Sequence, residues 1–355
     1  MKELTVIGLG NMGMKYLRDL ATRPFYGWQV SGQTTSPEKV DRLQAELPGL
    51  TVYQSFDEVI ANPEVTAVLI ATPNRFHFSM AKAALTAGKD VLLEKPAALS
   101  IAEIEELTDL ANKQHLVCDV MFQTRFSPVF QWLKQHSPEL GDLQRFHWEV
   151  PQYYRPQSYF TEGNWTGTWA KDGGGILLNQ AIHQLDLVNF LFGLPEKLVS
   201  QVSFGRYREI EVEDEAVLLL KYREGLLGTF VTSLNEPLGQ ERLEIIGEKG
   251  SFRYEGQQLT WQTPEQTTTI TFTNNGQRRK SHRAVIECFL QEITESGIEA
   301  RADRASSGIP VSENQKDFQL IHGALLSTWE ERWVELPIDG EQFMEKFSEH
   351  KKNLR

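Results

Sequence analysis

The sequence predicts two domains of different class: an N-terminal α/β domain on a parallel sheet, and a C-terminal α+β domain on a mostly antiparallel sheet. Residues 1–121 alternate short apolar runs with helical periodicity, and residues 198–273 hold apolar runs separated by turn residues. The 355 residues also exceed the size at which one hydrophobic core stops growing. We therefore expect domains at 1–123 and 124–340 and a C-terminal tail at 341–355.

Six apolar runs in the first domain are typical of strands that are buried on both faces. They are Leu4–Gly8, Trp28–Gly32, Thr51–Tyr53, Ala67–Ala71, Asp90–Leu93 and Leu116–Met121. Between them, the best-marked helix begins after Ser100, where Glu103 completes a capping box and apolar residues follow at helical spacing.

The second domain combines helices with a series of strands. An amphipathic helix is predicted from Ile176 to Phe192, and two more at Ala284–Ser296 and Glu313–Glu331. The predicted strands are Leu198–Phe204, Ala216–Tyr222, Leu226–Leu234, Arg242–Gly247, Gly250–Tyr254 and Thr267–Thr273. Gly, Pro, Asn and Glu turns between these strands favour antiparallel pairing.

Composition argues against several classes of protein. The net charge of -12 opposes binding to nucleic acid, and no cluster of Lys and Arg with interleaved aromatics offsets it. No stretch approaches the roughly 18 apolar residues of a membrane span, and the N-terminus enters a strand without a cleavable apolar segment. Cys118 and Cys288 lie in apolar stretches, which favours buried thiols in a cytoplasmic protein over a disulfide. We expect no metal site.

A glycine run follows the first strand and opens a helix. The first glycine permits a tight turn, the second lets backbone N–H groups approach a pyrophosphate, and the third allows the helix to pack on the strand. We therefore expect a Rossmann-type dinucleotide-binding domain whose cofactor contacts include Gly8, Gly10, Asn11, Met12 and Gly13. The alternative is a purely structural glycine turn.

The residues about 20 positions further on bear on the choice between NAD and NADP. NAD enzymes commonly carry an acidic residue there for the ribose, whereas this chain has Ser31–Ser36 without a carboxylate. The hydroxyls of Thr34 and Thr35, with Lys39 and Arg42 nearby, suit a 2′-phosphate. The loop therefore favours NADP, the alternative being a polar loop before a solvated helix.

Polar residues follow the fourth and fifth strands, at the edge where open α/β sheets bind ligands. They are Thr72, Pro73, Asn74 and His77 after the fourth strand, and Glu94, Lys95 and Pro96 after the fifth. Lys95 comes directly after an apolar run, so we expect it to be partly buried and to orient a substrate hydroxyl or relay a proton. The alternative is a surface lysine at a strand end.

Three glycines, Gly173 to Gly175, precede a helix that carries Asn179, His183 and Asp186. Asn179 and His183 are four residues apart, so a continuous helix places them on one face. Histidine exchanges a proton near neutral pH, as hydride transfer to or from an alcohol requires. His183 is therefore a catalytic candidate, although a lone helical histidine is more often structural.

Arginines and aromatics gather before that helix. Aromatic rings stack on sugar-like rings and arginines bind hydroxyls or phosphates, but clustered aromatics also pack loops onto sheets. The second-rank substrate candidates are Arg125, Tyr153, Tyr154, Arg155, Tyr159, Trp165 and Trp169.

Together these motifs resemble the family of glucose-fructose oxidoreductase, inositol dehydrogenase and MocA (Gfo/Idh/MocA). The matching residues are Gly8 to Gly13, Thr72-Pro73-Asn74 with His77, Gly88-Lys89-Asp90-Val91-Leu92-Leu93-Glu94-Lys95-Pro96, and Gly173-Gly174-Gly175 followed by Asn179, His183 and Asp186. The likeness spans nearly the whole chain. The run from Asn164 to Trp169 resembles the branch that includes nucleotide-sugar dehydrogenases.

The resemblance implies a Rossmann domain, a mostly antiparallel sheet domain, and a sugar or cyclitol that faces the nicotinamide. It places Lys95 and His183 in the catalytic cluster, with Asn74 and Glu94 beside the nicotinamide. Asn179 joins that cluster at a position where many polyol-oxidising members carry Asp.

The leading hypothesis is an NAD(P)-dependent dehydrogenase or reductase of a sugar, sugar derivative or cyclitol. The alternatives are a glycosidase that uses tightly held NAD for transient oxidation and a cofactor-binding regulator without catalysis. Threonine-rich faces at Gly228–Thr232 and Thr268–Phe272 also predict self-association, as a homodimer or homotetramer.

Overall fold

The computed structural model describes residues 2–151, 153–162, 166–273, 277–295 and 308–353. Contacts divide the chain into two compact units: residues 1–121 with 285–314, and residues 122–284 with 315–355. Residues 285–314 were predicted to belong to the second domain. The described part of α11 (Gln277–Glu295) instead contacts the first unit, since Lys2 Nζ donates to the Ile293 carbonyl at 3.0 Å and Trp28 Nε1 to Thr294 Oγ1 at 3.3 Å.

The first unit is built on a six-stranded parallel sheet of order β3-β2-β1-β4-β5-β6. The strands are β1 (Lys2–Ile7), β2 (Trp28–Gln33), β3 (Val52–Tyr53), β4 (Val65–Ile70), β5 (Asp90–Leu93) and β6 (Cys118–Val120). All six predicted strands are confirmed. The strand order reverses between β1 and β4, which is the point at which open α/β sheets bind ligands.

Helices connect these strands, and their apolar positions are buried. They are α1 (Asn11–Thr22), α2 (Pro37–Glu46), α3 (Phe56–Ala61), α4 (His77–Thr86) and α5 (Ile101–Gln114). From Val285 onward, α11 (Gln277–Glu295) also belongs to this unit. The predicted Ser100 cap of α5 is confirmed, because Ser100 Oγ accepts the Glu103 N–H at 3.2 Å. The capping box differs from the prediction, since Glu103 Oε2 accepts the Leu99 N–H at 2.8 Å in place of the Ser100 N–H.

The second unit holds a nine-stranded sheet of order β14-β13-β12-β11-β7-β10-β9-β8-β15. The strands are β7 (Leu143–Val150), β8 (Lys197–Phe204), β9 (Glu213–Lys221), β10 (Leu227–Ser233), β11 (Arg242–Gly247), β12 (Gly250–Glu255), β13 (Gln258–Gln262), β14 (Thr267–Thr271) and β15 (Val334–Glu335). Every pair is antiparallel except β7 with β10. The mostly antiparallel prediction is confirmed.

Three of these strands, β7, β13 and β15, were not predicted. The central strand β7 escaped notice because its buried residues, Phe146, Trp148 and Val150, alternate with exposed or half-exposed polar ones. A strand with one solvated face has no continuous apolar run.

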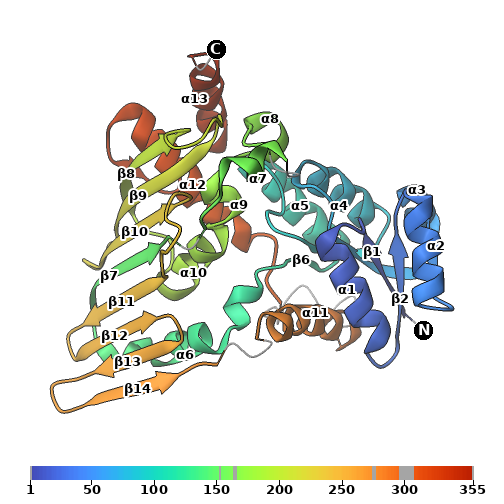
Figure 1. The fold of residues 1–355 in the computed structure, drawn as a ribbon, viewed down its shortest axis with the longest axis horizontal. Coiled ribbons are helices and arrows are strands. Elements are labelled where there is room, and N and C mark those ends of the chain that lie inside the picture. The colour runs from blue at the N-terminus through green and yellow to red at the C-terminus, as the bar shows by residue number, and fades with distance from the viewer. Residues whose placement is uncertain (1, 152, 163–165, 274–276, 296–307, 354–355) are drawn as a thin grey trace. The chain divides into compact units, whose positions relative to one another are not determined.

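Figure 1 shows α6 and α10 on one side of this sheet, among the helices of the second unit. They are α6 (Pro128–His136), α7 (Gln157–Thr161), α8 (Trp169–Asp172), α9 (Ile176–Asn179), α10 (Ile182–Phe192), α12 (Glu313–Glu330) and α13 (Gly340–Asn353). The predicted C-terminal tail thus contains a helix. Its Phe343 ring stacks on His322 of α12 at 3.6 Å between centroids.

The single amphipathic helix predicted from Ile176 to Phe192 is wrong in two respects. The helix ends at Asn179 and restarts at Ile182, because the Ala181 N–H donates to the Ile176 carbonyl, five residues back, at 2.7 Å. It is also not amphipathic, since Gln184, Asp186 and Asn189 are buried together with its apolar residues.

Candidate functional site

The glycine run of the first unit forms a close turn between β1 and α1. Gly8 has φ +83°, and a Cβ atom there would lie 2.6 Å from Thr72 Cγ2. A Cβ atom on Gly13 would lie 2.1 Å from the Gly8 carbonyl oxygen, whereas one on Gly10 would meet no atom within 4 Å. The space in front of Gly10 therefore remains open.

The start of α1 suits an anion. No side chain caps its first N–H groups, and its first turn holds no acidic residue. The partial positive charge of the helix end is thus left for a ligand phosphate, which fits the pyrophosphate of a dinucleotide against Gly10, Asn11 and Met12.

In the loop after β2, some polar residues form hydrogen bonds within the protein and others are exposed to solvent. Ser31 Oγ lies 2.8 Å from Thr5 Oγ1 inside the sheet, and buried Thr34 accepts the Ser36 N–H at 3.3 Å. Thr35 and Arg42 are exposed. Lys39 Nζ donates to the Leu9 carbonyl at 2.8 Å, so its ammonium group lies beside the glycine run.

His77 joins the loops that follow β4 and β5. Its Nδ1 lies 2.7 Å from the Pro96 carbonyl oxygen and its Nε2 lies 2.7 Å from the Thr72 carbonyl oxygen. Burial lowers the pKa of the imidazole, although both carbonyl oxygens oppose that shift. His77 therefore holds these two loops together, while Pro73 is exposed and Asn74 is half-buried.

Glu94 at the end of β5 is held from two sides. The Tyr16 hydroxyl of α1 donates to Oε1, and the Lys95 N–H donates to Oε2 at 3.1 Å. Lys95 itself is half-buried, and the Lys95–Pro96 peptide bond is cis. Tyr16 was not predicted as a site residue. It occupies a buried position of α1, where an aromatic side chain is expected to belong to the hydrophobic core.

In the second unit, Asn179 and His183 lie on either side of the break between α9 and α10. The expected shared helical face therefore does not exist, since the extra residue at the break rotates one helix against the other. Asn179 Nδ2 donates to the Gly174 carbonyl, back toward the glycine loop. Half-buried His183 meets the edge of the Phe122 ring at 6.0 Å between centroids.

Arg125 and Asp186 form a buried ion pair. Nη2 and Nε of Arg125 donate to Asp186 Oδ1 at 2.6 and 3.0 Å, and Nε also lies 2.9 Å from Oδ2. Asp186 is fully buried and Arg125 is 8% exposed. Arg125 therefore fixes the side of α10 one turn beyond His183 and neutralises the Asp186 charge.

The remaining substrate candidates fall into different environments. The Tyr153 hydroxyl donates to Gln184 Oε1 at 2.7 Å, next to His183 in sequence. The Arg155 guanidinium lies over the Tyr159 ring at 5.0 Å. Trp169 is buried against Phe204 and Phe347, at 6.3 and 5.1 Å between centroids, and Trp165 lies outside the described residues.

The structure therefore gathers the candidates into two clusters, one in each unit. The first contains the glycine run, the loops joined by His77, and Glu94 with Lys95. The second contains the glycine loop with Asn179, then His183, Tyr153 and the Arg125–Asp186 pair. Among the described residues no group of His, Cys, Asp and Glu has a geometry that holds a metal ion, and no helix is long and apolar enough to cross a membrane.

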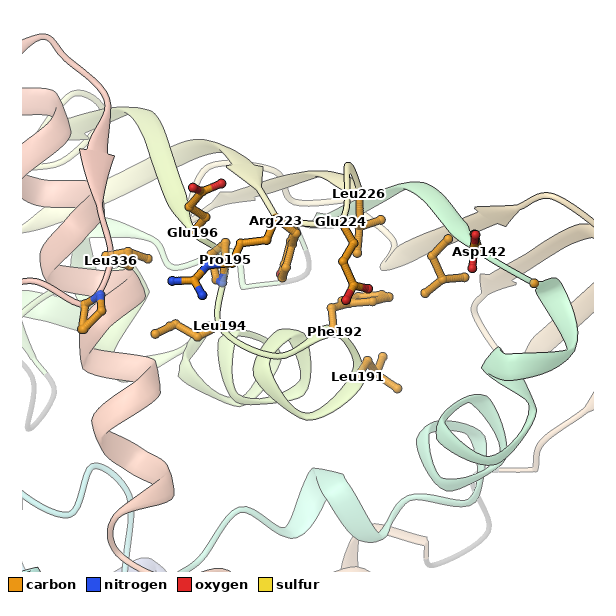
Figure 2. A pocket seen from close by; sticks show the side chains of 14 residues that line it. Asp142, Leu191, Phe192, Leu194, Pro195, Glu196, Arg223, Glu224, Leu226 and Leu336 are labelled. Carbon is orange, nitrogen blue, oxygen red and sulfur yellow. The ribbon is translucent and has the colours of Figure 1, made fainter.

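A cavity of about 860 Å³ lies in the second unit at the far end of α10 (Figure 2). Leu191 and Phe192 from the end of that helix line it, together with Tyr222 and Arg223 from the turn after β9. His183 lies at the other end of α10, about 13 Å away at the rise of an α-helix. The cavity contains none of the predicted site residues.

Tyr222 beside this cavity gives a prediction about stability. Its hydroxyl is buried without a hydrogen-bond partner among the described residues, and burial raises its pKa. Removing an unpartnered buried hydroxyl removes a desolvation cost, so we expect Tyr222→Phe to stabilise the protein by about 1 kcal/mol. Urea unfolding of both proteins measures the difference, and a less stable variant would show that the hydroxyl has a partner in solution.

Two family models match the chain. Residues 2–122 match the model described as "Oxidoreductase family, NAD-binding Rossmann fold", and residues 135–253 match the "GFO/IDH/MocA C-terminal domain". Together they cover about two thirds of the chain.

Curated relatives are similar in sequence to this chain over part of their length. An uncharacterized oxidoreductase of Synechocystis sp. is 34% identical over 215 residues, which is 56% of this chain and 57% of that protein. A second, from Schizosaccharomyces pombe, is 31% identical over 62% of this chain and 60% of its own. Both matches span less than two thirds of the relative. The scyllo-inositol 2-dehydrogenase (NAD(+)) of Bacillus subtilis is 27% identical over 69% of this chain and 71% of its own.

Solved structures share the fold along nearly the full length. The WlbA dehydrogenase from Bordetella pertussis, in complex with NADH and UDP-GlcNAcA, has a TM-score of 0.79 at 22% identity and covers 96% of this chain and 100% of its own. Levoglucosan dehydrogenase, in complex with NADH and levoglucosan, has a TM-score of 0.77 at 19% identity, with 95% and 100% covered. With its glycine turn, its two-sheet architecture and both family models in agreement, the chain belongs to the Gfo/Idh/MocA family of oxidoreductases.

Proposed function

We propose that the chain is an NAD(P)-dependent oxidoreductase that transfers hydride between the nicotinamide and a hydroxyl-bearing or carbonyl carbon of a sugar, sugar derivative or cyclitol. The open space at Gly10, at the uncapped start of α1, carries this proposal. It lies in the domain that matches the family's NAD-binding model. The substrate class is supported by scyllo-inositol 2-dehydrogenase among the relatives and levoglucosan dehydrogenase among the structural neighbours, while other relatives are trans-1,2-dihydrobenzene-1,2-diol dehydrogenases.

The residues of the first unit bind and orient the cofactor. Gly8, Gly10, Asn11, Met12 and Gly13 receive the pyrophosphate, and Thr34 and Thr35 line the ribose side. Thr72, Pro73 and Asn74 lie beside the nicotinamide half, with His77 and Glu94 holding their loops in place. When bound, the nicotinamide supplies or accepts the hydride.

Lys95 of the first unit and His183 of the second are the two candidates for the group that takes the hydroxyl proton of the substrate. Oxidation of an alcohol releases a proton from the hydroxyl as hydride leaves the same carbon, and a lysine or histidine nearby can orient that hydroxyl and take the proton. The Asp186 carboxylate adds no net charge near His183, because its ion pair with Arg125 neutralises its charge. Asn179, Tyr153 and Arg155 shape the substrate side, with Arg125 acting through α10 and Trp169 packed against Phe204 and Phe347.

A substrate panel tests this function. Free sugars, inositols and nucleotide sugars are each mixed with either cofactor, and absorbance at the reduced nicotinamide band is followed. Net reduction of the cofactor supports the proposal. Cleavage of a glycoside without net cofactor turnover would identify a glycosidase with transient redox, and tight cofactor binding without turnover of any substrate would favour a regulator.

We further propose that the chain binds NADP(H) at least as well as NAD(H). No carboxylate occupies residues 31–36, while Thr35 and Arg42 are exposed and the Lys39 ammonium group lies beside the glycine run. Lys39 and Arg42 offer two cations to a 2′-phosphate, and Glu38 in the first turn of α2 is the nearest acidic residue in sequence after this loop. Titration calorimetry with both cofactors measures the ratio, and an NAD(H) affinity tenfold or more above that of NADP(H) would exclude this assignment.

The outer face of the nine-stranded sheet supports self-association. Val217 and Leu227 on this face are each 44% exposed, and Val217 pairs directly with Val231 across the strands. Farther along the same face, Arg242 pairs with Glu255 at 2.9 Å and Arg253 with Glu244 at 2.7 Å. Interleaved charges beside an apolar patch suit a two-fold interface, where each surface meets a copy of itself.

We therefore expect an assembly of at least two 40.5 kDa chains at micromolar concentration, measured by sedimentation equilibrium. Val217→Lys places a charge in the apolar patch and shifts the assembly toward single chains. The matched control is Leu238→Lys, at a loop position that is 93% exposed. A wild-type mass of one chain would refute the proposed interface.

A further inference from the structure

Glu213, the first residue of β9, is a fully buried carboxyl group that the proposed reaction does not use. Its Oε1 accepts the Leu177 N–H at 3.2 Å, while its Oε2 is buried without a hydrogen-bond partner among the described residues. The N–H groups of Gly175 and Leu178 also act on this carboxyl group electrostatically. A carboxyl group from a distant strand therefore caps α9, which has no side-chain cap of its own.

The backbone of Glu213 also lies close to the glycine loop that precedes α9. A Cβ atom at Gly175 would lie 2.0 Å from the Glu213 carbonyl oxygen, so only glycine allows this approach. Beyond the contact, Asn179 closes the segment on itself, because its N–H donates to the Gly175 carbonyl at 2.9 Å and its Nδ2 to the Gly174 carbonyl. The loop is thus held between β9 and Asn179.

We propose that Glu213 is a positioning residue of the substrate half of the site: its carboxylate holds the first N–H groups of α9 and so fixes the Gly173–Gly175 loop and Asn179. The loop leads directly to His183 at the start of α10, so a displaced loop displaces both side chains. This inference rests on the proposed function only for its effect on substrate binding.

The charge state of Glu213 changes in the neutral range. Burial raises its pKa from 4.5 to about 7, and the facing N–H groups only partly offset that shift. The neighbouring acidic groups each have other partners. Asp214 accepts the Tyr207 N–H at 3.0 Å, and Asp172 accepts the N–H groups of Thr166 and Thr168 at 3.0 and 3.1 Å. Glu211 accepts the Trp169 N–H at 3.4 Å, and Glu215 pairs with Arg206 at 3.9 Å. His183 is the titratable group at the start of α10.

The raised pKa fixes the sign of a stability effect. The folded state holds the Glu213 proton more tightly than the unfolded chain, so this group's contribution to stability is full below pH 4.5 and is lost as pH rises through about 7. Glu213→Gln keeps the shape and does not titrate. The Tm of this variant relative to wild type should therefore rise between pH 5 and pH 8.

The decisive experiment compares Glu213→Gln, Glu213→Leu and the surface control Glu224→Gln by hydrogen exchange of the peptide spanning residues 173–179 and by steady-state kinetics. At pH 8 we expect exchange to be at least tenfold faster in the Leu variant and about threefold faster in the Gln variant. At pH 6, where wild-type Glu213 is itself protonated, the Gln variant should match wild type. The KM for substrate should follow the same pattern, while the Kd for cofactor stays within twofold in all variants.

A merely structural Glu213 would give a Gln variant that is more stable at pH 8 with unchanged KM and unchanged exchange, and that result would overturn the proposal. If the Leu variant does not fold, the pH-dependent ratio for the Gln variant decides alone. If no substrate turns over, the proposed function fails, but the exchange of residues 173–179 still confirms or refutes the positioning role.

Discussion

Lys95→Ala should lower kcat/KM for the best substrate by about 10²- to 10⁴-fold, the range that a positioned acid or base contributes. Lys95 follows β5, half-buried, with its own N–H on Glu94 Oε2. The backbone contact survives the substitution, so the cofactor should still bind within a few fold. Steady-state kinetics and cofactor titration on the same preparation measure the two effects separately.

Two further variants sharpen this prediction. Lys95→Arg keeps the charge, but a guanidinium group does not release its proton, so activity should stay low if Lys95 transfers a proton and return in part if it only orients the hydroxyl. Lys82→Ala, which removes an exposed ion pair with Glu106, is the control and should leave activity unchanged. A Lys95→Ala enzyme with most of its activity would remove Lys95 from the mechanism and leave His183.

The two glycines Gly10 and Gly13 should give opposite results when each is replaced by alanine. A Cβ atom at position 13 would lie 2.1 Å from the Gly8 carbonyl oxygen, so Gly13→Ala must move the turn and should destabilise the first unit by about 1–3 kcal/mol or more. A Cβ atom at position 10 meets nothing within 4 Å, so Gly10→Ala should fold with nearly unchanged stability.

We expect Gly10→Ala to differ from wild type in cofactor binding. The new methyl group of Gly10→Ala stands where the pyrophosphate approaches the backbone, so we expect its Kd for the dinucleotide to rise at least tenfold. Calorimetric binding and thermal unfolding, with and without cofactor, separate the two effects. Wild-type affinity in Gly10→Ala would mean that the pyrophosphate does not bind at this turn.

Much of the first unit could be predicted because its signals are local. Six apolar runs marked six strands, and the glycine turn required nothing beyond a tight turn that leads from a strand into a helix. Lys95 and Glu94 were found because the ends of parallel strands lie at one edge of a sheet.

The second unit shows what a local signal misses. The spacing of Asn179 and His183 predicted a shared helical face, but the Ala181 N–H reaches the Ile176 carbonyl and breaks the helix between them. Arg125 looked like a ligand for substrate until Asp186, 61 residues later in the chain, took its guanidinium group. Trp169 looked like a stacking platform until the C-terminal helix brought Phe347 against it.

The class of both domains, the order of most strands along the chain and the glycine turn could be predicted from local patterns, because strand burial, helix capping and glycine geometry depend on neighbours a few residues away. Which polar groups have partners depends on the folded chain. Tyr16 on Glu94, His77 between two loops and Glu213 beneath α9 join residues 5 to 78 positions apart. Burial then set the pKa of Glu213, since desolvation depends on everything packed around a group and not on its place in the chain.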